Sequence, residues 1–116
     1  MAEVLRVVDG DTVAVRALIW PGHRVEVKVR LAGVNTPELF RPSCDQERAL
    51  AHTAADFVQA HIGAEVELEN VRFGKYAGRV VANIRTASGE SLGDLLLSAG
   101  LAHKQNDRSG WCALVN

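Results

Sequence analysis

The stretch HRVEVKVRL, residues 23–31, alternates strictly between charged and apolar side chains after its first position. The alternation divides the stretch into two faces, Val25, Val27, Val29 and Leu31 against Arg24, Glu26, Lys28 and Arg30. A period of two is typical of a strand that is buried on one side only. RLAGVNTPE, residues 30–38, then gathers polar side chains around a Thr-Pro turn at the end of this strand. Because catalytic groups concentrate in loops carried by rigid strands, this junction is the first candidate for a functional site.

The composition is that of a globular protein of one-domain size. The chain has 116 residues, of which 47% are hydrophobic and 23% charged, and such a length can bury a substantial core. Thirteen basic and fourteen acidic residues give a formal charge of -1 and a pI near 6.4. Proteins that hold nucleic acid by bulk electrostatics are usually strongly basic. Any nucleic-acid binding is therefore expected to be weak and to depend on local positive charge.

The sequence offers no signal peptide and no run long enough to span a membrane. It is compatible with work in the cytoplasm or with a leader that has been removed. The two cysteines, Cys44 and Cys112, leave two readings open. They are either free thiols or a single disulfide that ties the tail to the loop after residue 38, which would imply an oxidising compartment.

Two more strands are predicted before the opening stretch. VLRVVDGDTVAVRAL, residues 4–18, divides at Asp9-Gly10-Asp11. An Asp-Gly dipeptide between apolar runs favours a hairpin, because glycine accepts a positive φ without steric cost. WPGH, residues 20–23, is a second predicted turn, so three consecutive antiparallel strands are expected.

A helix, two strands and a second helix are expected to follow. Ser43 and Gln46 have capping-box spacing, and helical spacing of apolar residues then continues to a stop at Gly63. AEVELENV (64–71) and GRVVANIRT (78–86) are predicted strands, joined by a basic connection. Ser91, with Asp94 three residues later, begins the second predicted helix, which ends at Gly100.

This element order is that of a five-stranded barrel of the oligonucleotide/oligosaccharide-binding (OB) type, in which a helix plugs the barrel between strands three and four. We therefore predict a mainly β fold with helices, of the α+β class. A single domain is expected over residues 1–116, with a core from about 4 to 103 and a polar, loosely held tail. Trp111 is expected to pack this tail against the body.

Three polar clusters fall on the connections of this barrel: Asp9, Asp11 and Thr12; Arg30, Asn35, Thr36 and Glu38; and Lys75, Tyr76 and Arg79. Taken singly, each residue is most simply a turn or surface residue. Together they suit phosphodiester hydrolysis. Arginine grips phosphate with a planar fork, oxygen ligands suit calcium, and a glutamate can orient or deprotonate water.

Four motifs in this order carry a resemblance to a known family: DGDT (9–12), RLAGVNTPE (30–38), GKYAGRVVA (74–82) and SLGDLLLSAGLA (91–102). The chain resembles the staphylococcal nuclease (thermonuclease) family from about Val4 to about His103. The resemblance implies a five-stranded barrel with helices, and calcium-dependent cleavage of phosphodiesters in DNA and RNA.

Carried over residue by residue, the resemblance implies two catalytic arginines at Arg30 and Arg79 and a catalytic glutamate at Glu38. Lys75 and Tyr76 match positions that contact the phosphate end of the substrate. The KYAGR stretch holds one residue more than the commonest form, KYGR, which loosens the expected register of Tyr76.

The resemblance also implies a calcium site. Its ligands fall on Asp11, on Asn35, and on Thr36 through the backbone carbonyl, while Asp9 matches a second acidic position near the metal. The family usually has an aspartate where this chain has Asn35. An amide oxygen still binds calcium, but one negative charge fewer predicts a lower affinity.

Two functions from different classes follow. The first is a sugar-nonspecific, calcium-dependent nuclease with one ion per active site, acting as a monomer on DNA or RNA and preferably on single strands. The second is a catalytically weak or inactive module that binds nucleic acid or a protein partner, and Asn35 is the feature that favours it. The tail has no tyrosine on which a base can stack, so weak substrate binding is expected in both cases. A calcium enzyme favours a secreted or periplasmic location with the leader removed.

Overall fold

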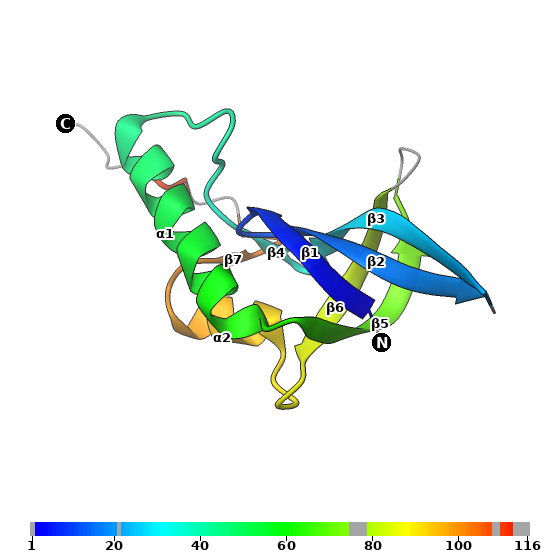
Figure 1. The fold of residues 1–116 in the computed structure, drawn as a ribbon. Helices are drawn as coiled ribbons and strands as arrows, with labels where there is room; N and C mark the ends of the chain where they lie inside the picture. Colours follow the sequence, from blue (N-terminus) through cyan, green and yellow to red (C-terminus); the bar gives the residue numbers. More distant parts are fainter. Residues whose placement is uncertain (1, 21, 75–78, 108–109, 113–116) are drawn as a thin grey trace.

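A computed structural model describes residues 2–20, 22–74, 79–107 and 110–112 (Figure 1). Five strands close into a barrel in the order β1-β2-β3-β6-β5. They are β1 (Ala2–Asp9), β2 (Thr12–Trp20), β3 (His23–Leu31), β5 (Glu65–Phe73) and β6 (Arg79–Thr86). A second sheet pairs β4 (Val34–Asn35) with β7 (His103–Lys104), and the helices are α1 (Asp45–Ile62) and α2 (Leu92–Ser98). The predicted α+β class and OB-type barrel are confirmed.

The three N-terminal strands form the predicted antiparallel meander, and β6 then pairs with β3 in parallel. The turn between β1 and β2 lies at the predicted dipeptide, but the predicted reason for its glycine is wrong. Gly10 is not among the glycines with a positive φ. A Cβ built on Gly10 would instead lie 2.9 Å from Thr36 Oγ1 and 2.9 Å from the Ala54 Cβ. Glycine is therefore needed here because the turn packs directly against the residue-36 loop and α1.

The alternation of β3 is confirmed over most of its length. Val27, Val29 and Leu31 are buried in the barrel core, whereas Val25 is 45% exposed. Val25 is exposed because β3 is paired on both sides over only part of its length. β6 joins β3 only from Lys28 onward, so the start of β3 pairs with β2 alone and projects from the barrel as a hairpin (Figure 1).

Helix α1 ends where predicted, at Gly63, but begins one residue later than the predicted cap. The N-cap is Cys44, whose sulfur accepts a hydrogen bond from the Glu47 N–H. The Ser43 N–H donates a hydrogen bond to the Glu47 carboxylate. Further along, α1 supplies Ala54, Val58 and Ile62 to the core. The helix thus both fills one end of the barrel and fixes the loop that precedes it.

Helix α2 confirms the second predicted helix, which was expected to begin at Ser91 and to end at Gly100. The Ser91 side chain accepts from the Asp94 N–H, and Gly100 has a positive φ just beyond the last turn. Leu92 and Leu96 are fully buried. Neither helix, within the described residues, is long and apolar enough to cross a membrane.

The segment after α2 is held more firmly than the sequence predicted. Residues 103–104 pair with β4, and the ring of Trp111 stacks on His103 with centroids 3.8 Å apart. Cys112 forms a disulfide with Cys44, so of the two readings left open, the disulfide is the one found. The prediction of a loosely held tail is wrong for these residues because strand β4 and Cys44, which hold them, lie 68 to 70 residues away in sequence.

The disulfide allows a stability prediction. It links residues 68 apart in sequence, and a native disulfide typically stabilises a fold by about 2–4 kcal/mol. We expect Cys112→Ser to lower the free energy of unfolding by that amount in urea titrations. Adding reductant should lower the stability of the wild-type chain similarly and leave the variant unchanged. Equal stability of the two chains without reductant would contradict the prediction.

Candidate active site

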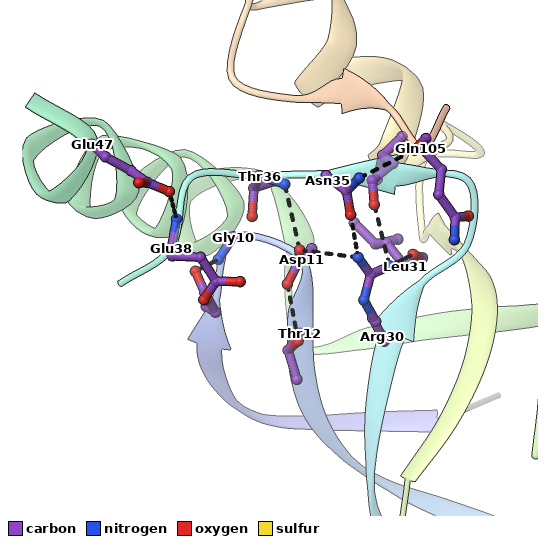
Figure 2. Close-up of polar contacts among 12 residues, drawn as sticks. Gly10, Asp11, Thr12, Arg30, Leu31, Asn35, Thr36, Glu38, Glu47 and Gln105 are labelled. Carbon is purple, nitrogen blue, oxygen red and sulfur yellow. Dashed lines mark hydrogen bonds and ion pairs between the residues drawn. The ribbon is translucent and has the colours of Figure 1, made fainter. Parts of the chain in front are cut away.

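The candidate site lies where the β1–β2 turn meets the end of β3 and the loop that follows it (Figure 2). Asp11, on the turn, is nearly buried. One of its carboxylate oxygens accepts from the Thr12 hydroxyl at 3.1 Å, and the other from the Thr36 N–H at 3.4 Å. The second oxygen also lies 3.6 Å from Nη2 of Arg30. The turn, strand β3 and the loop are thus joined through one carboxylate.

Arg30 occupies the last outward position of β3 and is half-buried. Its Nη1 donates to the Leu31 carbonyl at 2.8 Å and to the Val34 carbonyl at 3.2 Å. Its Nη2 donates to Oδ1 of Asn35 as well as facing Asp11. Four acceptors around one guanidinium fix its position and plane. Because they engage both terminal nitrogens, a two-point contact with a phosphate would use Nε together with an Nη2 N–H released from Asn35 or Asp11.

Asn35 links this arginine to the C-terminal segment. While Oδ1 accepts from Arg30, Nδ2 donates to the Gln105 carbonyl at 3.5 Å. The Gln105 N–H in turn donates to the Gly33 carbonyl at 2.9 Å. The amide therefore does something an aspartate cannot, because a carboxylate has no donor for the Gln105 carbonyl.

Glu38 is exposed and lies in the loop after β4, pointing back toward the β1–β2 turn (Figure 2). Partial burial raises the pKa of its carboxyl above the ordinary value, and the negative charges of Asp11 and Glu47 add to this. A carboxylate with a raised pKa accepts a proton from water more readily. Asp9 is buried beside it and accepts from the Gly10 N–H at 2.7 Å. Burial raises the pKa of Asp9 to about 6.

The loop that carries Glu38 is anchored by a residue that sequence reasoning missed. Glu47, in the first turn of α1, is 6% exposed. Its carboxylate accepts from the Glu38 N–H at 2.9 Å and from the Ser43 N–H at 2.7 Å. These two bonds hold the pKa of Glu47 below its usual range. The sequence signal for Glu47 was only its place among the acidic residues of a first helical turn, which a helix dipole already explains.

Arg79 begins β6 and is exposed. Its register partner on β3 is Lys28, while Arg30 pairs with Val81. Side chains two apart on a strand share a face, so Arg30 and Arg79 project from the same wall of the barrel. The predicted substrate contacts Lys75 and Tyr76 lie outside the described residues.

A comparison with protein families agrees with this arrangement. The family described as Staphylococcal nuclease homologue matches residues 28–110. The chain belongs to the staphylococcal nuclease homologue family. This confirms the resemblance found in the sequence, and nuclease-like function is what the family suggests. A search of curated proteins found no match.

The donors of this staphylococcal nuclease homologue suit a hard cation such as calcium. Asp11 offers a carboxylate, Asn35 an amide oxygen and Thr36 a backbone carbonyl, and all of these are oxygen ligands of the kind calcium takes. Thr36 also has a buried hydroxyl without a hydrogen-bond partner in the described part of the chain. No group of three or more His, Cys, Asp or Glu side chains in that part is arranged to hold a metal. A calcium ion at Asp11 would therefore draw on neutral oxygens as well.

Proposed function

We propose that this chain is a calcium-dependent nuclease that hydrolyses phosphodiester bonds of DNA and RNA with little sequence preference, residues 1–116 working as one domain. The observation that carries the proposal is the guanidinium of Arg30. It is held by two backbone carbonyls and two side chains, beside a buried carboxylate and within the site that holds Glu38. An arginine that is only solvated at the surface is not held by four protein acceptors in this way.

Each residue has a role in this proposal. Arg30 and Arg79, on one wall of the barrel, hold the scissile phosphate and stabilise the negative charge that builds on it. Glu38 orients or deprotonates the attacking water, helped by its raised pKa. Asp11, Asn35 and Thr36, with Asp9 close by, would hold calcium, which would supply Lewis-acid stabilisation of the phosphoryl oxygens. Lys75 and Tyr76 complete the contacts to the substrate.

A second candidate function rests on Asn35. With an amide in place of a second carboxylate, Asp11 is the one carboxylate within ion-pair distance of Arg30 among the described residues. Calcium would then bind weakly, and the chain would serve as a phosphate-binding barrel for nucleic acid or a protein partner, with little or no turnover.

The two functions are separated by incubating the purified chain with single-stranded DNA, in millimolar calcium and in a chelator. A double variant, Arg30→Ala with Glu38→Ala, serves as the inactive reference. Cleavage that requires calcium and disappears in the variant supports the nuclease. DNA that is bound but never cut at millimolar calcium would contradict it and favour the binding module.

Substitution of Asn35 gives a separate prediction. Asn35→Asp adds a negative charge among the ligands, and ligand charge tunes calcium affinity. We expect tighter calcium binding by calorimetry, on the order of tenfold, together with a small loss of stability because the Gln105 carbonyl loses its donor. Asn106→Asp, which adds the same charge at an exposed neighbouring position, is the control. Equal calcium affinity in both variants would exclude Asn35 as a ligand.

A further inference from the structure

Several cations of this chain lie on one wall of the barrel without an acidic partner. Lys28, Arg72 and Arg79 are all exposed, and within the described ranges none of them makes an ion pair. Other arginines do have acidic partners: Arg6 with Glu26, Arg16 with Glu3, Arg48 with Asp45 and Arg85 with Glu69.

The strand registers place these cations on one face. One row across the sheet runs from Arg30 to Val81 and on to Arg72, and the next row pairs Lys28 with Arg79. Residues in register project to the same side of a sheet. That side is the outer one, because the alternate residues, such as Val29 and Val80, are buried inside the barrel. We call Lys28, Arg30, Arg72 and Arg79 the basic face.

The basic face is electrostatically costly as it stands. Like charges directly opposite each other on neighbouring strands destabilise a sheet, and Lys28 and Arg79 are such a pair. The acidic residues nearest along the same strands are already engaged, Glu26 by Arg6 and Glu69 by Arg85. The chain as a whole carries a formal charge of -1, so this positive patch is local.

We infer that the basic face binds the sugar-phosphate backbone of a single-stranded polynucleotide, with Lys28 and Arg72 holding phosphates on either side of the one held by Arg30 and Arg79. This inference rests on the proposed function and deepens it by naming the path of the substrate. Strands lie about 4.8 Å apart, so the backbone positions of Arg30 and Arg72 are about 10 Å apart. Long, flexible side chains at that spacing contact more than one phosphate. A polynucleotide would thus be held by the wall of the barrel, although the tail offers no tyrosine for stacking.

The test measures binding without relying on cleavage. A fluorescent oligonucleotide of about twelve thymidines, within the site size of one such barrel, is titrated with the chain in a chelator at several salt concentrations. Lys28→Gln and Arg72→Gln are each expected to weaken binding on the order of 3- to 10-fold and to reduce the slope of log K against log salt by about 0.7. Arg48→Gln removes one positive charge from α1 and should bind as the wild type does. Thermal melting of all four chains checks that the fold is retained.

The outcomes separate this inference from the proposed function. Binding that weakens in the two variants supports the basic face, whether or not the wild type cuts DNA in calcium. Variants that bind like Arg48→Gln would overturn it even if the wild type is an active nuclease, as would a wild type that does not bind the oligonucleotide. Displacement by polyglutamate as effective as displacement by unlabelled oligonucleotide would show a general anion surface, and would also overturn it.

Discussion

Replacing Arg30 with alanine is expected to lower the rate of phosphodiester cleavage about 100- to 1,000-fold, the usual cost of removing one preorganised donor to a developing negative charge. The loss should appear mainly in kcat, because the interaction strengthens as charge builds on the phosphate. Arg30→Lys should recover little of the rate. A lysine ammonium keeps the charge but cannot donate in a fork to a phosphate or reach all the acceptors that hold Arg30 in place.

The control for this experiment is Arg16→Ala. Arg16 is an exposed arginine on β2 that pairs with Glu3, so its removal changes the net charge equally and leaves the site intact. Initial rates on single-stranded DNA, with thermal melting of each variant, give the comparison. An Arg30→Ala chain that is folded and cuts DNA as fast as Arg16→Ala would remove Arg30 from the mechanism.

Glu47→Ala is expected to lower activity strongly, although Glu47 is not placed to touch the substrate. It would free the N–H groups of Glu38 and Ser43 that the carboxylate now accepts, and the loop that carries Glu38 would lose its anchor. A displacement of about 1 Å in a catalytic group can cost on the order of 100-fold in rate. We expect kcat to fall by about 10- to 100-fold while KM stays nearly constant, since Arg30 and Arg79 are unaffected.

Glu47→Gln distinguishes positioning from a general loss of stability. Glutamine keeps one acceptor oxygen and so preserves one of the two bonds, and its kcat should lie between those of the wild type and Glu47→Ala. Glu38→Gln in the same assay reports the loss of the carboxylate itself. If Glu47→Ala changes the melting temperature but leaves kcat unchanged, Glu47 is structural only.

The same carboxylate makes stability depend on pH. The two N–H donors hold the pKa of Glu47 below its ordinary value of 4.5. Its ionised form therefore stabilises the fold fully above about pH 4.5, and this contribution is lost as the pH falls through the lower, folded-state pKa. Urea titrations between about pH 3 and 6 should show a steeper loss of stability toward acid for the wild type than for Glu47→Gln. Parallel curves would contradict the assigned pKa direction.

Most of the fold was predictable because local sequence patterns determine most of its strands, turns and helices. Alternation located β3, the Asp-Gly dipeptide located the first hairpin, and Ser91 located the start of α2. The errors arose where distant residues decide the outcome. The short strand β7 exists only because β4 lies beside it, and Gly10 is required by the approach of α1 rather than by its own turn.

The side chains of the candidate site were predictable from the sequence, whereas the residues that position them were not. Family motifs pointed to Arg30, Glu38 and Asn35, because their side-chain chemistry suits phosphate and calcium. Glu47 and Gln105 support the site through bonds to or from backbone groups. The backbone partners in these bonds leave no residue pattern, because every residue supplies a carbonyl and every residue except proline an N–H group.

The link between Asn35 and Gln105 has a consequence for the order in which the chain matures. Synthesis proceeds from the N-terminus at roughly 5–20 residues per second, so every strand of the barrel emerges before residues 103–112 do. A nascent chain with a closed barrel still lacks the carbonyl that orients the Asn35 amide and the cysteine that clamps the Glu38 loop. Closure of the barrel and completion of the site are therefore separable steps, because the site needs residues 103–112 and none of the five barrel strands lies among them.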